Sequence, residues 1–404
     1  MKVLFTTPVF GVPPIGGPEL RIANTIRALS RVSELSVYVR RNQASPVVNT
    51  NFEGVPIFFE KTTHGNLSRN IAAFYRLHLS KVIMKYGSGE AKRIIKLCEQ
   101  EDCQIVWFGY GNISLHVIRK LKKFSPSILV VCDTDSVWSR FLLRAIPFVG
   151  VRHKIINFIY GNLKIIQEKK LLSISDVLTA VSDVDAKFYA QLFPSIPCEI
   201  AVISNSVDLS TRENWLKKDD ILKHPALTII GSFGHATSAM DIGTRWFLEK
   251  VWENVRTSSP EATLYIVGGG SERNWTSDPD RKIEVLGRVE STGQILNFTD
   301  LNLVPLLFES GTRFKILESG MYRRPVVSTS LGAEGLDVEN EKEIIISDDP
   351  TEFARAISSM LHAENNDYLG ENLYQKVLAK YTLKTLEEEC AKVLKILESK
   401  FPKN

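Results

Sequence analysis

The 404-residue sequence is poor in cysteine and has no long run of apolar residues. Its five cysteines form no CxxC pair and no metal-like spacing, so a disulfide-stapled or zinc-bound domain is not expected. Their odd number and scatter indicate core thiols in a reducing, cytoplasmic compartment. No segment offers about 18 uninterrupted apolar residues, which predicts that nothing spans a membrane. The opening MKVLFTTPVF is typical of a strand rather than a signal peptide, because turn residues follow a short apolar run.

Acidic residues are scarce in the first half of the chain. Residues 1–205 carry 26 Lys and Arg against 15 Asp and Glu, whereas residues 206–404 carry 24 against 31. We therefore expect the first half to meet something anionic. Two basic-aliphatic stretches, 61–96 and 140–164, suit an anionic membrane surface; core helices with cations at their edges remain the alternative. Nucleic acid is not an expected partner, since the second half is acidic and no binding motif occurs.

Short apolar strands alternate with helical stretches along the whole chain. In the first half we expect strands at 2–7, 35–40, 55–59, 105–109, 128–133, 177–182 and 200–205. In the second half we expect them at 226–233, 262–270, 283–287, 301–307, 325–330 and 343–347. Continuous Val, Ile and Leu between helices predicts parallel sheets covered on both faces.

This pattern occurs twice, and the segment between the copies, 207–225, is polar and charged. The length also favours two domains over one. We predict an α/β chain with a first Rossmann-like domain over 1–205 and a second over 206–382. Residues 383–404 read as one amphipathic helix, which we expect to pack back on the first domain.

The stretch ESGTRFKILESG, residues 309–320, follows the apolar strand LNLVPLL. Ligands of α/β sheets gather at the carboxyl ends of the strands. Gly311 permits a tight turn, after which the free amides of a short helix form an anion site. Arg313 and Lys315 add charge suited to a diphosphate, and Glu318 lies one turn further, where a carboxylate can accept from ribose hydroxyls. A solvated helix face is the alternative.

The longer stretch SGTRFKILESGMYRRPVVSTSLGAEGL resembles the donor-site signature of retaining glycosyltransferases of the GT-B fold, the family-four type. Further segments are similar to that family in the same order: PPIGGPELR, TAVSDVDAKFY, AVISNSVD, YIVGGG and EVLGRVES. The resemblance implies two Rossmann-like domains whose parallel sheets face each other across a cleft. It also implies transfer of a sugar from a nucleotide-diphosphate donor with retention of configuration, with no required metal or other cofactor. The expected setting is synthesis of a surface polysaccharide or glycolipid.

The same resemblance assigns residues to the donor and to catalysis. The first domain would hold a sugar or lipid-linked acceptor, and its glycine loop would contact the donor diphosphate, although a plain turn is the alternative. The expected donor-binding residues are Gly16, Gly17, Gly234, His235, Gly268, Gly269, Arg288, Val289, Gly311, Thr312, Arg313, Lys315 and Glu318. The expected catalytic residues are Asp133, Asp135, Arg313 and Lys315.

The sequence departs from the family pattern at three places. No Arg or Lys occurs between Gly234 and Arg245, where relatives often carry diphosphate-binding cations. Counting back eight positions from Glu318, where the family has another glutamate, leads to Ser310 with Glu309 beside it. Asp133 and Asp135 stand where relatives often place a histidine, and they either take the acceptor's proton or cap the next helix.

Two other functions stay open at this point. One is a nucleotide-sugar epimerase or hydrolase on the same fold, which needs dedicated acid and base groups. The other is a homologue that binds nucleotide without turnover, which the departures from the family pattern allow. In either case G-x-G-x-x-G is absent after the first strand, which argues against NAD or FAD.

Overall fold

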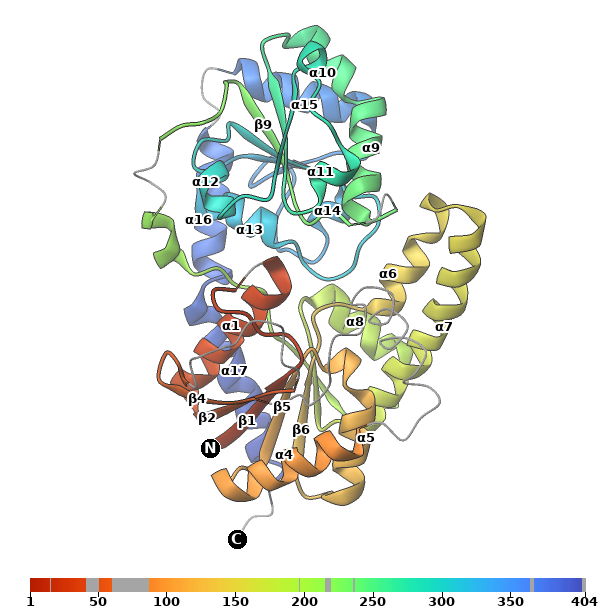
Figure 1. Ribbon diagram of the computed structural model, residues 1–404, viewed down its shortest axis with the longest axis vertical. Coiled ribbons are helices and arrows are strands. Elements are labelled where there is room, and N and C mark those ends of the chain that lie inside the picture. The colour runs from red at the N-terminus through yellow and green to blue at the C-terminus, as the bar shows by residue number, and fades with distance from the viewer. Residues whose placement is uncertain are drawn as a thin grey trace. The chain divides into compact units, whose positions relative to one another are not determined.

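The computed structural model describes residues 1–14, 16–40, 51–59, 87–195, 197–214, 219–234, 237–363 and 367–401. The chain folds into two compact units, each built on one sheet (Figure 1). Unit 1 comprises Met1–Val137, Asn162–Ser204 and Leu386–Asn404, and unit 2 comprises Trp138–Gly161 and Asn205–Thr385. Among the helices in the described ranges, none has the length and apolar character needed to cross a bilayer.

Unit 1 contains an eight-stranded sheet in the order β3-β4-β2-β1-β5-β6-β7-β8. Its strands are β1 (Lys2–Thr7), β2 (Glu34–Val39), β3 (Asn51–Phe52), β4 (Val55–Phe59), β5 (Ile105–Gly109), β6 (Leu129–Asp133), β7 (Val177–Ala180) and β8 (Glu199–Val202). Neighbouring strands are parallel except for the short edge pair β3 and β4. The helices of this unit are α1 (Gly16–Val32), α4 (Ser88–Glu101), η1 (Gly111–Ile113), α5 (Leu115–Phe124), α8 (Asp183–Leu192) and α17 (Leu383–Glu398), which starts just before the unit boundary.

Alternate residues of the unit 1 strands pack into two different cores. Phe5 and Trp107 pack on the side of α1 and α17, whereas Leu4 and Phe108 pack on the side of α4 and α5. Figure 1 shows these two helix pairs on opposite sides of the sheet. Because both faces are covered, the central strands are apolar over most of their length, on both faces of the sheet, which explains their apolar runs. The tail helix contributes five residues to the α1 side: Leu386, Cys390, Val393, Leu394 and Leu397.

Unit 2 contains a parallel six-stranded sheet in the order β11-β10-β9-β12-β13-β14. Its strands are β9 (Ala226–Ile230), β10 (Thr263–Val267), β11 (Ile283–Gly287), β12 (Leu301–Val304), β13 (Val326–Ser328) and β14 (Ile345–Ile346). Its helices are η3 (Leu209–Asn214), α9 (Ala239–Lys250), α10 (Trp252–Ser258), α11 (Ser271–Asn274), η4 (Pro279–Arg281), α12 (Thr292–Leu296), α13 (Phe314–Met321), α14 (Ser330–Ala333), α15 (Pro350–His362) and α16 (Asp367–Lys380). Successive residues of β9 again pack into different cores, since Ile229 and Ile230 belong to different clusters.

The prediction of two parallel-sheet α/β halves is confirmed, and each expected strand matches a strand of the structure within a few residues. The two-residue strand β3 is not anticipated, because a pair this short carries no periodicity. The sequence pattern also assigns 138–161 to the first domain, whereas these residues group with unit 2. They include α6 (Trp138–Arg144), η2 (Ile146–Phe148) and the start of α7 (Val151–Ile174). Ala145 and Phe141 pack against the unit 2 core, a long-range contact that no local pattern encodes.

Candidate functional site

A buried arginine holds the turn between β12 and α13 in unit 2. Gly311 has a φ of 84°, in the left-handed region that favours glycine. The Arg313 guanidinium is 4% exposed and donates hydrogen bonds to the carbonyls of Ser310, Gly311 and Leu331. From the sequence we expect Arg313 on a diphosphate, but its guanidinium is engaged by these backbone carbonyls. Arg313 therefore sets the shape of the turn from which α13 begins.

The first turn of α13 offers backbone amides for an anion. Its N-cap residue, Arg313, has extended backbone, and among the described residues no side chain caps the helix. The amides of an uncapped helix start, together with the helix dipole, favour a negative ligand. Thr312, just before this start, accepts a hydrogen bond through Oγ1 from Asn205 Nδ2 at 2.8 Å. Asn205, which belongs to the motif AVISNSVD and lies in unit 2, thus supports the turn.

Lys315 and Glu318 stand one turn apart on α13, and both are half-buried. Lys315 Nζ lies 2.7 Å from Met240 Sδ, and burial lowers the lysine's pKa to about 8. Glu318 accepts a hydrogen bond from Thr292 Oγ1 at 2.7 Å, and burial raises the pKa of its carboxyl. In the described part of unit 2, neither side chain has an ion-pair partner within 4 Å. The two opposite charges therefore lie near each other on the half-buried face of α13 without forming an ion pair.

The strand-end loops after β9 and β10 lie directly against each other. A Cβ at Gly268, whose φ is 132°, would lie 1.7 Å from the carbonyl oxygen of Gly231. A Cβ at Gly270, with a φ of 89°, would lie 2.3 Å from the carbonyl oxygen of Phe233. At Gly269 a Cβ would meet nothing within 4 Å. Backbone packing alone thus requires glycine at 268 and 270, and contact of Gly268 or Gly269 with a nucleotide stays a prediction.

The other expected donor residues of unit 2 have simple surroundings. Gly234 donates its amide to Asp241 Oδ2 at 3.2 Å, at the start of α9. Arg288 follows β11 and is exposed, and within the described residues it has no hydrogen-bond or ion-pair partner, while Val289 is half-buried. His235 lies outside the described residues, as do residues 61–86 of the first basic stretch. Among the expected donor residues described in this paragraph, Arg288 is therefore a cation that is available to bind a ligand.

Sequence reasoning does not find the carboxylate of Glu334, which lies after α14. It accepts from Arg144 Nη1 and Nη2, both at 2.8 Å, and from Arg140 Nη2 at 3.0 Å. Burial opposes ionisation, but the hydrogen bond from Arg144 and the two positive charges lower the pKa of Glu334 overall. Arg144 also donates to the carbonyl oxygen of Glu309 at 3.1 Å. Through Arg144, the segment 138–161 thus holds the loop that carries Glu309, and this loop leads into the turn before α13.

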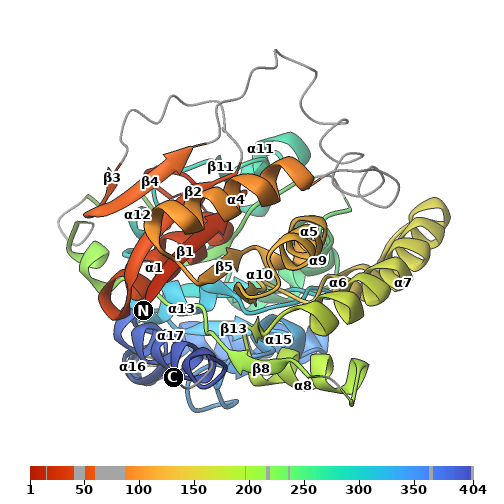
Figure 2. The same ribbon diagram turned by 90° about the horizontal axis from the view of Figure 1, so that it is seen from below.

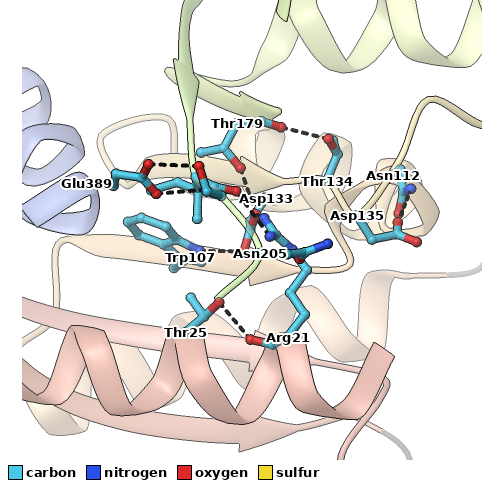
Figure 3. Close-up of polar contacts among 12 residues, drawn as sticks. Arg21, Thr25, Trp107, Asn112, Asp133, Thr134, Asp135, Thr179, Asn205 and Glu389 are labelled. Atoms are coloured by element: carbon cyan, nitrogen blue, oxygen red, sulfur yellow. Dashed lines mark hydrogen bonds and ion pairs between the residues drawn. The ribbon is translucent and has the colours of Figure 1, made fainter. Parts of the chain in front are cut away.

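In unit 1, Asp133 ends β6 inside a buried hydrogen-bond network (Figure 3). Its Oδ1 accepts from Arg21 Nη2 at 2.6 Å and from Thr179 Oγ1 at 2.7 Å. Its Oδ2 accepts from Trp107 Nε1 at 3.2 Å, and the side chain is 1% exposed. Both oxygens are therefore engaged by the protein itself, an arrangement that joins α1 to three strands or strand ends of the sheet.

Asp135, two residues further, is half-buried. It accepts from Asn112 Nδ2 at 2.5 Å and from Ser136 Oγ at 3.3 Å (Figure 3). Its negative charge raises the pKa of Tyr110 further, after burial, and counteracts the lowering of the Lys164 pKa by burial. Asp135 thus belongs to a polar cluster at the carboxyl end of β6, where α/β proteins bind ligands.

The expected glycine loop of unit 1 forms the start of α1. Gly16 has a φ of 76°, and a Cβ there would meet nothing within 4 Å. Gly17 is half-buried and lies in the first turn of the helix, together with the acidic Glu19. A glycine in the left-handed region with open space around it is compatible with two interpretations: a backbone that binds a ligand, or a plain turn. Contact of Gly16 and Gly17 with a diphosphate stays a prediction.

No metal-binding cluster of three or more His, Cys, Asp or Glu side chains occurs among the described residues. The five cysteines are all free and buried. Burial raises the pKa of the Cys98 and Cys198 thiols to about 12, which keeps these thiols protonated and unreactive at neutral pH. These thiols therefore act as core side chains.

Comparison with known proteins bears on this site directly. Residues 224–363, which contain α13 and the strand-end loops, match the family model described as glycosyl transferases group 1. No curated protein sequence is detectably similar to the chain.

Solved structures are similar over nearly the whole chain. Sucrose-phosphate synthase from Thermosynechococcus elongatus has a TM-score of 0.71 at 14% identity, covering 99% of this chain and 100% of that one. HepE from Anabaena, in complex with UDP and glucose, has a TM-score of 0.67 at 13% identity, covering 98% and 99%. The lipopolysaccharide outer core galactosyltransferase WaaB has a TM-score of 0.61 at 14% identity, covering 99% and 100%. The chain therefore has the GT-B fold of two Rossmann-like domains, and residues 224–363 of its second domain match the group 1 glycosyl transferase model.

Proposed function

We propose that this protein is a glycosyltransferase that moves a sugar from a nucleotide-diphosphate sugar to an acceptor hydroxyl, with retention of configuration. The observation that carries the proposal is the pair Lys315 and Glu318, one turn apart at the uncapped start of α13. The family match of residues 224–363 favours a sugar donor over other nucleotides. The fold shared with structures holding UDP and glucose supports the same reading.

Unit 2 binds the donor in this proposal. Lys315 and the first amides of α13 contact the diphosphate, and Glu318 accepts from the ribose hydroxyls, oriented by its hydrogen bond from Thr292. The three-residue offset places the two side chains about 4.5 Å apart along the helix axis, similar to the step from a diphosphate to its ribose. Arg313 serves as a positioning residue, because its guanidinium holds the carbonyls of the turn and so aims the amides.

The chemistry follows from these charges. The bond between the anomeric carbon and the diphosphate oxygen breaks, and Lys315 with the helix amides stabilises the charge that develops on the leaving diphosphate. The acceptor oxygen forms its bond on the same face of the sugar, and its proton passes to the leaving phosphate oxygen or to a protein carboxylate. Unit 1 holds the acceptor, and Asp135, which is half-buried, is more accessible for the proton role than Asp133, which is 1% exposed.

The proposed setting is the synthesis of a surface polysaccharide or glycolipid at the inner face of the cell membrane. The basic balance of residues 1–205 supports an acceptor or surface of negative charge. The structural similarity to a lipopolysaccharide galactosyltransferase agrees with this setting. A required metal ion is not part of the proposal, because Lys315 and the amides supply the positive charge.

Nucleotide binding tests the donor site. We expect Lys315→Ala and Glu318→Gln each to weaken binding by about 1–3 kcal/mol, the usual loss for a charge-assisted contact. Isothermal titration calorimetry with UDP, GDP, ADP and CMP measures this loss of affinity and shows which nucleobase the protein prefers. Matched controls are Lys342→Ala and Glu352→Gln, which remove exposed charges paired three residues apart elsewhere in unit 2. Unchanged affinity in folded Lys315 and Glu318 variants would refute the site.

Turnover separates the proposal from its two competitors. Incubation with the selected nucleotide sugar and a panel of acceptors should yield a glycoside whose anomeric configuration equals that of the donor. Rapid release of free sugar or an epimer without acceptor would instead indicate a hydrolase or epimerase. Tight donor binding with no transfer to any acceptor would indicate a binding homologue.

A further inference from the structure

Four buried polar side chains lie beneath helix α13, and two of them interrupt strands that are otherwise apolar. They are Thr228 on β9, Thr299 just before β12, Asn302 on β12 and Ser319 on α13, and each is 0% exposed. Thr228 and Asn302 are direct neighbours in the pairing of β9 with β12. A buried polar group costs free energy unless it is hydrogen-bonded, so the role of these residues follows from their contacts. We name the four residues the polar network.

The polar network is connected by hydrogen bonds that end on the backbone of α13. Thr228 Oγ1 donates to Asn302 Oδ1 at 3.1 Å, and Asn302 Nδ2 donates to Ser319 Oγ at 2.7 Å. Ser319 Oγ in turn donates to the carbonyl oxygen of Lys315 at 2.7 Å. The strands of the sheet are thus hydrogen-bonded to the turn of α13 that carries the lysine of the donor site.

The polar network also reaches α12, whose first residue orients Glu318. Thr299 Oγ1 donates to the carbonyl oxygen of Ile295 on α12 at 3.0 Å and lies 3.4 Å from Thr228 Oγ1. Thr292, the first residue of α12, donates to Glu318. A continuous path therefore runs from α13 through both strands to α12 and back to α13. Both charged residues of α13 are held to the same pair of strands.

Apolar packing by itself would hold α13 less precisely. Another side of the helix packs against α16, and the two helices lie together in both views (Figures 1 and 2). There a Cβ at Gly320 would lie 2.8 Å from Val377 Cγ2 and 2.9 Å from Leu373 Cγ. Apolar contacts are non-directional and permit a small rotation or shift of a helix, whereas hydrogen bonds depend on distance and angle. Ser319 follows Lys315 by one turn on the same side of α13, so the polar network fixes the helix where the lysine is attached.

We propose that Asn302 and Ser319 are positioning residues for nucleotide binding, which hold Lys315 and Glu318 at the rotation and height that the donor requires. This inference rests on the proposed donor site. Both residues are fully buried, so they act through α13 and not by touching the ligand. A shift of the charged groups by about 1 Å is enough to lose much of their effect.

An apolar replacement of the polar network separates positioning from stability. The triple variant Thr228→Val, Asn302→Leu and Ser319→Ala replaces donors and acceptors together by apolar groups of similar size, so the free energy of unfolding should change little. Nucleotide affinity should fall about tenfold, because α13 is no longer fixed. Isothermal titration calorimetry with the nucleotide that the parent binds most tightly measures the loss. Unchanged affinity in the folded triple variant would overturn the proposal.

A double-mutant cycle tests whether the polar network acts through the charged residues of α13. In a protein that already carries Lys315→Ala, adding the triple change should weaken binding by only about threefold or less, because one of the two groups that it positions is gone. Equal fold losses with and without Lys315→Ala would show a purely structural role and would overturn the proposal.

The same titrations distinguish this inference from the donor site on which it rests. A loss of affinity in Lys315→Ala and Glu318→Gln, with none in the triple variant, would overturn the positioning role alone. No loss in any of these variants would overturn the donor site itself.

A smaller variant and a matched control complete the test. Ser319→Ala alone cuts the connection to α13 and should weaken nucleotide binding about threefold, so it carries the test if the triple variant does not fold. The control is Thr263→Val with Ser259→Ala, which removes two buried hydroxyl groups near the amino end of β10 and should bind nucleotide like the parent. Circular dichroism and the thermal midpoint show which variants are folded. Equal losses in the control and in the network variants would contradict the proposal.

Discussion

Asp133 in unit 1 and Lys315 in unit 2 are both charged residues near the carboxyl ends of strands, but their surroundings are opposite. Asp133 is buried and accepts three hydrogen bonds, one of them from the cation Arg21. Lys315 is half-buried, and in the described part of unit 2 the closest partner of its Nζ is a methionine sulfur. A charge satisfied inside the protein serves its stability, whereas one left unsatisfied at a desolvation cost is suited to a ligand.

The largest expected effect comes from breaking the satisfied charge. Asp133→Ala should lower the free energy of unfolding by about 3–5 kcal/mol, because it leaves Arg21 buried without its carboxylate. Thermal and urea unfolding measure the change. The control is Asp102→Asn, which removes the exposed partner of Lys2 and should cost less than about 1 kcal/mol. A loss of that small size at Asp133 would mean that the network is not what holds β6 in place.

The glycine loop of unit 2 sharpens the comparison, because there backbone packing rather than charge decides which residue is allowed. Gly268→Ala should destabilise the protein by about 2–3 kcal/mol, since its Cβ would overlap the Gly231 carbonyl at a positive φ. Gly269→Ala is the matched control and should change stability by about 0.5 kcal/mol or less, because the space around it is open. Equal stabilities of the two variants would contradict the packing of these loops.

Removing the unsatisfied charge of Lys315 should change the free energy of unfolding in the opposite direction from Asp133→Ala. Lys315→Met should leave the unfolding free energy unchanged or raise it by about 1 kcal/mol, because it removes a desolvated cation and keeps the apolar stem. Nucleotide affinity should fall in the same protein. Thermal midpoints with and without nucleotide measure both effects. A clear loss of stability without nucleotide would place Lys315 with Asp133, as a structural charge.

The pH dependence of nucleotide binding gives the smallest effect and reports on Lys315 alone. Burial lowers the pKa of Lys315 to about 8, and a bound diphosphate raises it again because the cation gains a partner. Affinity is therefore complete below pH 8 and falls as the pH rises through 8, by at most about tenfold per unit. Titration calorimetry across this range should show the fall in the parent and a flat profile in Lys315→Ala. A flat profile in both would mean that Lys315 does not touch the phosphates.

Local sequence was sufficient for the strands and for the turn from which α13 begins, because periodicity and turn residues act over a few positions. It was insufficient for side-chain partners. The sequence predicts Arg313 as a ligand cation, and it did not indicate that the guanidinium also holds three backbone carbonyls, which depends on the path of the loops. Glu334 and Arg144 lie 190 positions apart and form a bidentate pair, so neither residue carried a signal by itself.

By itself the sequence determined the two parallel α/β halves and the turn that begins α13, since both follow from apolar periodicity, glycine and helix-start chemistry. Only the tertiary structure decided which charges are satisfied: Asp133 is closed off by side chains from distant segments, whereas Lys315 and Glu318 are not. It also decided that residues 138–161 pack with unit 2. The physical reason is that burial and pairing depend on groups brought together from far along the chain, which no short segment encodes.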